Sequence, residues 1–425
     1  MEVSVESKKG SLRQLFAFRN YTILLAANFI SRFGDSLDAI AYSWMVYVLT
    51  GSKLMLGTLF AINAIPNIVF GPFAGVIADR FDKKRLIIVG YMGRGIVVSI
   101  TALMFFAGVL QPWHLFVFTI INSTFETLTA PVFISLVPLL VSKEFYLSAN
   151  SFSTSAYKFA ELIGAGAAGA IIALTGVSGA IFIDGSTFFA AVLIILFIKI
   201  EKDKGELEKI DAKGYLNQLK EGFRFIKSNH LIKTGIILMA ILNFCLSPIN
   251  VLMPAFVNEQ LKGGAEILSL LGVAFAVGII LGGIVVGQIG QKFKNSTLIS
   301  FGLLFFGLNY CMMYLPGNIV PAGMAATAIA AANFFIFGFI IPMISSPITT
   351  SVMLNTEKSM MGRVGAIIGM VAMCAVPLGS AIVGAICEKL SMSTIFAIMG
   401  GIIALLGMKT MCDKELKESA QQKRR

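Results

Sequence analysis

The sequence predicts an all-α membrane protein whose twelve transmembrane helices form two six-helix bundles. Three features lead to this prediction: the composition, the spacing of the apolar segments, and the distribution of Lys and Arg among the connecting segments. The chain has 425 residues, of which 56% are hydrophobic and only 13% are charged, whereas soluble domains contain about 25% charged residues. A water-soluble fold of this composition would expose extended apolar surface and aggregate, so we expect this surface to face lipid.

The apolar segments have the length of membrane spans. A transmembrane helix needs about 20 consecutive, mostly apolar residues. Segments that meet this requirement lie near 21–49, 55–78, 86–109, 112–140, 149–175, 178–199, 231–256, 267–290, 297–316, 319–345, 363–387 and 392–411. The most polar region of the chain separates the sixth from the seventh, so we divide the chain into an N-terminal bundle (1–199), a linker (200–230) and a C-terminal bundle (231–425).

The linker itself contains apolar residues at helical spacing, namely Leu216, Leu219, Phe223 and Ile226. Two interpretations fit this pattern. The segment is either an amphipathic helix that lies on the membrane surface or a solvated helix that connects the two bundles.

The basic residues alternate between successive connecting segments. Most of the 34 Lys and Arg residues lie in the N-terminus, the linker, the C-terminus and every second loop, whereas Lys53, Lys262 and Lys389 fall in the intervening loops. Loops rich in Lys and Arg stay in the cytoplasm, which places both termini and the linker there, in a bacterial-type inner membrane. The net charge of +11 then faces anionic lipid, and no nucleic-acid partner is needed to explain it.

Several function classes find no support in the sequence. The five Cys residues lie in or beside apolar segments without a CxxC pair, and the two His residues, His114 and His230, stand near segment ends. We therefore expect no metal site and no cofactor. The motifs GxSxG and HExxH and the phosphate-binding loop are absent from the sequence, which argues against an enzyme.

The loop between the second and third predicted helices carries the most specific motif, GVIADRFDKKR at 75–85. Basic residues alone would serve as a cytoplasmic anchor. Here a Gly permits close packing, and an acid can accept hydrogen bonds at a neighbouring helix N-terminus, where positive partial charge collects. We interpret the motif as a functional element, with candidate residues Gly75, Asp79, Arg80, Lys83, Lys84 and Arg85.

This motif resembles the loop signature of the major facilitator superfamily, and the whole chain resembles the drug-export branch that includes macrolide-efflux and enterobactin-export proteins. Further matches are FISRFGD (29–35), YVLTGS (47–52), APVFISLVPLLV (130–141), LKEGFRFIKSNHLIK (219–233) and MGRV (361–364). The sequence departs from the family pattern at three places. Asp82 stands where the family usually has Gly, Ala165 replaces the Pro of a Gly-Pro pair, and Gln291 replaces an acid in the second-half copy of the loop, GQIGQKFKNS (287–296).

The resemblance implies a secondary transporter in which two bundles rock around a midplane cavity. It further implies that the loop motif acts as a gate, in which Asp79 contacts the start of the eleventh helix, at Gly362 and Arg363, when the cavity opens outward. We expect a monomeric, proton-driven exporter of small amphipathic molecules such as macrolides. A siderophore exporter or a small-solute importer of the same fold is the alternative within transport, and a scaffold or sensor is the alternative outside it.

Charged residues within the predicted spans are the remaining candidates, because a charge at mid-bilayer costs at least about 2.5–3.5 kcal/mol. On the first helix, a polar stripe falls on one face and must meet protein or water: Asn28, Ser31, Arg32, Asp35, Asp38 and Tyr42. The spacing pairs Arg32 with Asp35 and, on the fifth helix, Lys158 with Glu161. Such pairs either serve transport or simply join helices.

Three further charges stand singly: Arg94 and Glu126, and Asp184, which we expect near the membrane interface. Burial in apolar surroundings favours the neutral form of a carboxyl group. Asp35 is our first candidate for a proton carrier and Glu126 the second, with Asp38 as a further cavity-lining group. All these internal charges lie in the N-terminal bundle, which suggests that this bundle handles the proton and the C-terminal bundle shapes the substrate site.

Overall fold

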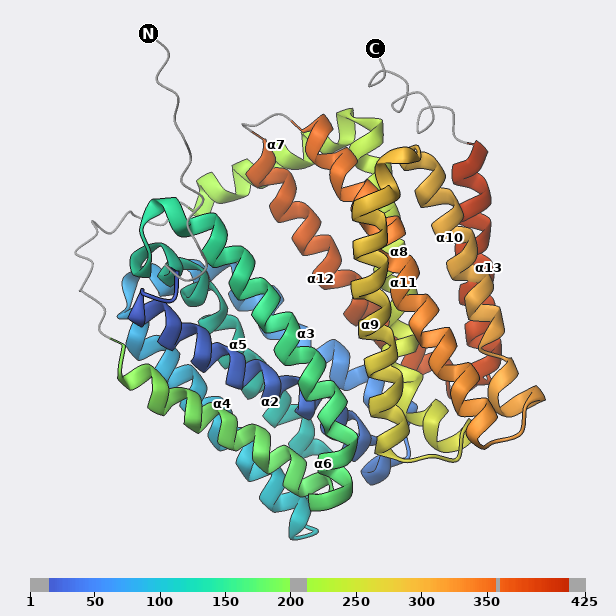
Figure 1. Ribbon diagram of the computed structural model, residues 1–425, viewed down its shortest axis with the longest axis horizontal. Helices are drawn as coiled ribbons and strands as arrows, with labels where there is room; N and C mark the ends of the chain where they lie inside the picture. Colours follow the sequence, from blue (N-terminus) through green and yellow to red (C-terminus); the bar gives the residue numbers. More distant parts are fainter. Residues whose placement is uncertain (1–14, 199–211, 357–359, 413–425) are drawn as a thin grey trace.

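A computed structural model describes residues 15–198, 212–356 and 360–412 of the chain. Within these ranges the chain folds into long helices joined by short turns (Figure 1). The helices are α2 (Arg19–Thr50), α3 (Lys53–Arg80), α4 (Lys83–Phe106), α5 (Pro112–Leu140), α6 (Tyr146–Leu196), α7 (Ala212–Ser228), α8 (His230–Ala255), α9 (Ala265–Ile289), α10 (Asn295–Met312), α11 (Met324–Asn355), α12 (Met361–Ile386) and α13 (Met392–Cys412). Short helical turns lie at η1 (Lys143–Phe145), η2 (Phe256–Gln260), η3 (Gly290–Lys292) and η4 (Leu315–Ile319).

The structure confirms the predicted twelve-helix architecture. In the described parts of the chain, ten helices are long and apolar enough to cross a membrane. One of them, α6, has 51 residues and breaks at Gly176, where φ is 73°. At 1.5 Å per residue it is far longer than one bilayer crossing needs, so it supplies two spans. The remaining span is α2, which has 32 residues and carries the charged stripe.

The predicted helix ends are mostly close to those observed, and the tenth span is the clearest error. We expected a helix at 319–345, but α11 runs from Met324 to Asn355. Its start is delayed because Gly317 has φ 83° and Gly323 has φ 150°, which interrupts the helix. Its end is later because Pro342 and Pro347 lie inside α11 without terminating it, as membrane helices tolerate.

The helices α2–α6 pack against one another, as do α8–α13, and we call these two groups the N-half and the C-half. The halves meet mainly through α3 against α12 and α6 against α9. Gly57 makes the first contact possible, because a Cβ there would collide with the carbonyl oxygen of Ser380 and lie 2.9 Å from Gly384 Cα. The predicted chain division at 199 and 230 remains a prediction of the sequence, since residues 199–211 lie outside the described ranges.

The GAGAAG segment of α6 lies between the two halves. A Cβ on Gly164 would collide with the carbonyl oxygen of Phe33 in α2, and one on Gly169 would lie 2.7 Å from Glu266 Cα in α9. Ser269 of α9 donates a hydrogen bond to the carbonyl oxygen of Ala165. The small residues therefore let α6 approach α2 on one side and α9 on the other.

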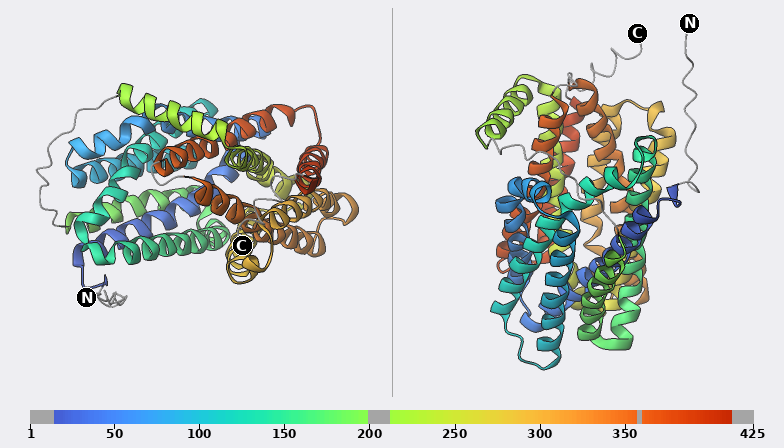
Figure 2. Two further views of the ribbon diagram at one scale, coloured as in Figure 1. Left: turned by 90° about the horizontal axis from the view of Figure 1, so that it is seen from above. Right: turned by 90° about the vertical axis from the view of Figure 1, so that its left-hand side faces the viewer.

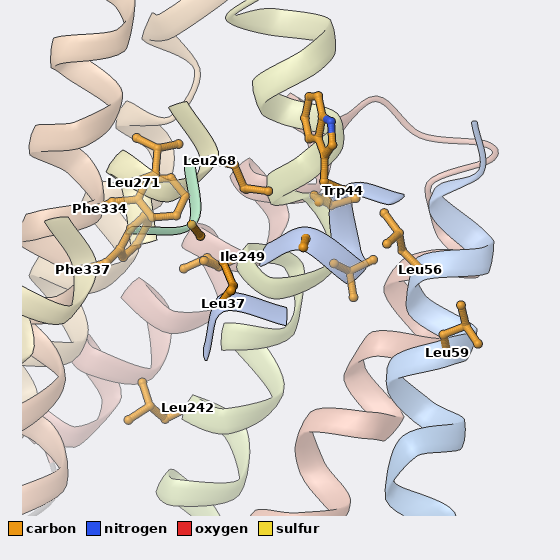
Figure 3. Packing of buried hydrophobic residues seen from close by; sticks show 14 of the residues in the cluster. Leu37, Trp44, Leu56, Leu59, Leu242, Ile249, Leu268, Leu271, Phe334 and Phe337 are labelled. Atoms are coloured by element: carbon orange, nitrogen blue, oxygen red, sulfur yellow. The ribbon is translucent and has the colours of Figure 1, made fainter. Parts of the chain in front are cut away.

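Buried apolar side chains from both halves belong to one cluster (Figure 3). Leu37 and Trp44 contribute to it from α2, and Ile249 and Leu268 from α8 and α9. A contiguous cluster of this kind marks a shared packing core. It positions the charged face of α2 relative to the C-half.

Helix α7 lies at the edge of one end of the molecule (Figures 1 and 2), which we call the α7 end. It packs on α12 and α8. Of its four predicted apolar positions, Ile226 is buried whereas Phe223 is 53% exposed, and the side chains of Leu216 and Leu219 lie outside the description. The helix predicted in the linker is therefore present, with only part of its apolar face covered by protein.

Candidate functional site

An ion-pair network occupies the interior of the N-half, with Arg94 of α4 at its centre. The guanidinium Nη2 of Arg94 lies 2.6 Å from Asp35 Oδ1 on α2 and 3.9 Å from Glu126 Oε2 on α5. Arg94 is buried, with 7% of its side chain exposed. The network joins three helices that are distant in sequence, and an arginine suits this role because its planar group stays charged and offers several donors.

Uncharged groups hold Arg94 in place. Its Nε donates to Asn122 Oδ1 at 3.2 Å, and its guanidinium carbon lies 4.3 Å from the centre of the Phe188 ring. A cation over an aromatic face gains further stabilisation when it is desolvated. Neither Asn122 nor Phe188 is among the site residues predicted from the sequence. Asn122 could have been predicted from its position, because it lies one helical turn before Glu126 on α5 and therefore on the same face.

The outer part of the network is more open. Arg32 Nη1 lies 3.8 Å from Asp35 Oδ2 and 3.9 Å from Glu126 Oε1. The side chains of Arg32 and Glu126 are 36% and 41% exposed. The predicted Arg32–Asp35 pair is thus confirmed, but Arg94 is the closer partner of Asp35.

Two acids of the N-half, the half-buried Asp38 and the buried Asp184, have no ion pair among the described residues. Asp38 Oδ1 is buried without a hydrogen-bond partner in that part of the chain. Asp184 is 1% exposed, and Thr187 Oγ1 lies 3.4 Å from its Oδ1. A Cβ on Gly34 would collide with the Asp184 carboxylate, so that glycine lets α2 approach α6. Our expectation that Asp184 lies near the membrane interface is wrong, because its carboxylate lies beside Gly34, near the middle of α2.

A cavity of about 300 Å³ lies beside this network. Its apolar part is formed by side chains of α2–α6. Its polar part is formed by the network together with Asp38, Tyr42, Ser43, Asn63, Thr101, Thr119 and Asn122. The apolar lining residues are Ala39, Val46, Leu56, Leu59, Phe60, Val97, Val98, Phe118 and Ile181. Ligand pockets combine an apolar wall with a few placed polar groups in this way.

The predicted polar stripe of α2 faces protein. Asn28 and Ser31 are buried, and Ser31 Oγ lies 2.9 Å from the hydroxyl of Tyr91 on α4. The Tyr42 hydroxyl lies 2.8 Å from Thr119 Oγ1 on α5. The stripe therefore binds α2 to α4 and α5 above and below the charge network.

Lys158 and Glu161 form the second predicted pair, away from the network. Lys158 Nζ lies 2.7 Å from Glu161 Oε2, and the two side chains are 69% and 39% exposed. The carbonyl oxygen of Glu161 accepts a hydrogen bond of 2.6 Å from Ser36 on α2. The charges pair with each other on α6, and the contact to α2 is made by the backbone.

Part of the predicted gate has a structural role. The side chain of Asp82 accepts from the backbone N–H of Arg85 at 2.9 Å and caps α4, as acids at this position commonly do. Lys84 Nζ donates to the carbonyl oxygens of Leu196 and Ile198, at 2.7 Å each, at the end of α6. These contacts explain why an acid is suitable at position 82 and why the loop needs a cation at 84.

The proposed contact of the gate with α12 stays a prediction. The side chains of Asp79 and Arg80, and the surroundings of Gly75 and Gly362, lie outside what the structure describes. Arg363 Nη1 donates to Glu221 Oε2 on α7 at 2.6 Å. Arg363 is thus engaged by the linker helix in this conformation.

At the end opposite α7, one acid of the C-half contacts the N-half twice. Glu259, in η2, accepts a hydrogen bond from the Tyr47 hydroxyl at 2.6 Å and pairs with Lys53 Nζ at 2.8 Å. The Gly57–Gly384 and Gly169–Glu266 contacts lie toward the same end, since α3 begins and α12 ends there. These contacts hold the halves together at that end.

Comparison with known proteins agrees with this architecture. Macrolide efflux protein A of Streptococcus pyogenes is 22% identical over 378 residues, covering 89% of this chain and 91% of the relative. The staphyloferrin A transporter of Staphylococcus aureus is 22% identical over 304 residues, covering 68% and 74%. A mutant of the nucleoside transporter NupG superposes with a TM-score of 0.75 at 13% identity, covering 92% and 99%, which shows a shared fold. The family model of the Major Facilitator Superfamily matches residues 24–377, and the chain therefore belongs to this superfamily of membrane transporters.

Proposed function

We propose that this transporter is a proton-coupled exporter of amphipathic compounds such as macrolides, and that it works as a monomeric antiporter by alternating access. The observation that carries the proposal is the charge network of the N-half, with Asp38 beside it and without an ion pair in the part of the chain that the structure describes. A charged carboxylate without a partner is costly to bury. A proton removes that cost in one conformation, and rearrangement toward water or a cation allows its release in another.

The network favours Asp38 over Asp35 as the proton carrier. Asp35 already lies 2.6 Å from Arg94, so its charge is balanced within the network. Asp38 lines the same cavity without an ion pair among the described residues. Glu126 lies 3.9 Å from both Arg32 and Arg94 and serves as a second site that balances the two arginines.

The cavity supports an amphipathic substrate. Carboxylates and arginines line one part of it, and Leu59, Phe60 and Phe118 line another. Its volume of about 300 Å³ is at the lower limit of ligand pockets. A macrolide is larger, so we expect only a substituent of it, such as an amino sugar, to enter the N-half.

Two features support alternating access. The halves are joined by Glu259 at one end, and Arg363 is held by α7 at the other. We infer that transport breaks the first contact and brings Asp79 to the start of α12. With both termini in the cytoplasm of a bacterial-type cell, a cysteine at position 53 or 262 is labelled from outside by a membrane-impermeant maleimide. Labelling from the cytoplasm alone contradicts this orientation.

The decisive experiment is transport by purified protein in liposomes. An outward-directed substrate flux should depend on an imposed pH gradient, and cells that express the protein should tolerate more macrolide. The resemblance to a staphyloferrin A transporter makes siderophore export the second candidate, and import of a small solute is a third. A siderophore flux without macrolide flux selects the second, and proton-driven uptake selects the third.

A further inference from the structure

Helix α7 lies directly against the start of α12. Gly222 and Ile226 are its buried residues on this side. A Cβ on Gly222 would lie 2.8 Å from Ile367 Cδ1 and 3.2 Å from Arg363 Cβ. The backbone of α7 therefore approaches α12 closely.

The opposite face of α7 is exposed and basic. At about 100° per residue, Lys220, Arg224 and Lys227 lie opposite Gly222 and Ile226, and all three are exposed. Phe223 lies beside them and is 53% exposed. The single acid of residues 220–228 is Glu221. Its Oε2 lies 2.6 Å from Arg363 Nη1, so it neutralises the charge of Arg363 on α12. The exposed face of α7 therefore keeps its positive charge.

Helix α7 lies at the level where the spans end. The helix runs along the outer edge of the α7 end, and Figure 2 shows it beside the spans. It ends at Ser228, shortly before the apolar span Ile232–Gln260. A helix with Lys and Arg beside an exposed aromatic ring, at the level where a span begins, has the chemistry of an interfacial helix.

We propose that Lys220, Phe223, Arg224 and Lys227 form a docking surface for anionic lipid headgroups, such as the phosphodiester of phosphatidylglycerol. Cations near an anionic leaflet are each attracted to it, and the ring of Phe223 inserts at the boundary of the acyl chains. The occupant is a lipid because the three cations share a face with an exposed aromatic ring, which a free phosphate would leave in water. Through Glu221 and Arg363, the bound lipid anchors the start of α12.

The test uses Phe223→Trp as a reporter in a Trp44→Phe/Trp113→Phe background, reconstituted in vesicles of phosphatidylcholine with one quarter phosphatidylglycerol. Brominated phosphatidylglycerol should quench the reporter at least about twofold more strongly than the same amount of brominated phosphatidylcholine. Replacing the cations (Lys220→Gln/Arg224→Gln/Lys227→Gln) should abolish the difference. The matched control, Lys292→Gln/Lys294→Gln, removes exposed cations from the α9–α10 turn and should preserve it.

Equal quenching by the two lipids would show that α7 contacts the membrane without preferring an anionic headgroup, and it would overturn the proposal. Absence of quenching would make α7 a solvated helix, with the same consequence. If the loss of Trp44 unfolds the chain, native mass spectrometry of the wild type and the triple variant compares the number of retained phosphatidylglycerol molecules. These measurements need no transported substrate, so their failure leaves the proposed export function untouched, and the reverse also holds.

Discussion

The interiors of the two halves use different chemistry to hold their helices together. In the N-half, Arg94 joins α4 to Asp35 and Glu126. In the C-half, the corresponding interior is aromatic, and the rings of Tyr310 and Phe337 lie 4.8 Å apart. Neutral hydrogen bonds complete it, for example from Asn309 Nδ2 to the carbonyl oxygen of Asn333 at 2.9 Å.

This difference separates a bundle interior that can respond to a proton from one built of uncharged groups. A network of acids and arginines changes its charge balance when one proton arrives. Packed rings with neutral hydrogen bonds have no such change available near neutral pH, and they keep their geometry. We therefore expect pH to act on the N-half while the C-half serves as a fixed partner.

The largest effect is expected from Arg94→Met. This change leaves Asp35 and Glu126 without their buried partner, and breaking a buried pair costs about 3–5 kcal/mol. The variant should lose most of its folded protein on detergent size-exclusion chromatography and all transport. Adding Asp35→Asn should recover part of the folded fraction, and a single variant as stable as the wild type would show that the network is not structural.

The next largest effect compares the two copies of the loop motif. Asp79→Ala should abolish transport while the protein remains folded and inserted, because the contact with the start of α12 is lost. Gln291→Ala, at the matching position of the second half, should transport at close to the wild-type rate. Normal flux from Asp79→Ala would refute the gate.

Within the N-half, Asp38→Asn should lower gradient-driven substrate accumulation by more than about tenfold, because the proposed proton carrier is lost. Substrate exchange and folding should persist, because the change breaks no ion pair. Asp35→Asn should also lose accumulation, but with reduced thermal stability because Arg94 loses its closest partner. The measurement is uptake in liposomes with and without a pH gradient. If Asp38→Asn, Asp35→Asn and Glu126→Gln all still pump, these acids carry no coupling proton.

The smallest effect belongs to the C-half. Tyr310→Phe removes the hydroxyl that donates to the carbonyl oxygen of Cys245, which should cost about 1 kcal/mol of stability. The pH dependence of transport should remain that of the wild type. A shifted pH profile in this variant would end the division of labour between the halves.

The sequence by itself determined the membrane class, the twelve spans and the identity of the charged residues. Apolar length and the placement of charge are local properties that depend little on which helix lies next to which. The polar stripe of α2 could be recognised from its periodicity, because any polar face within a bilayer must meet protein or water. The pairs at i, i+3 followed from helix geometry for the same reason.

Only the tertiary structure decided the partners. Asp35 meets Arg94 more closely than the neighbouring Arg32, and Asp184 is covered by α2 rather than placed at an interface. These outcomes depend on how closely glycines such as Gly34 let two helices approach each other. The periodicity of residues along a single helix carries no information about that distance. That Asp38 has no ion pair within the described ranges likewise results from the packing of α2, α4 and α5. The partner of a charge within the bundle is set by distance in space and not by distance along the chain.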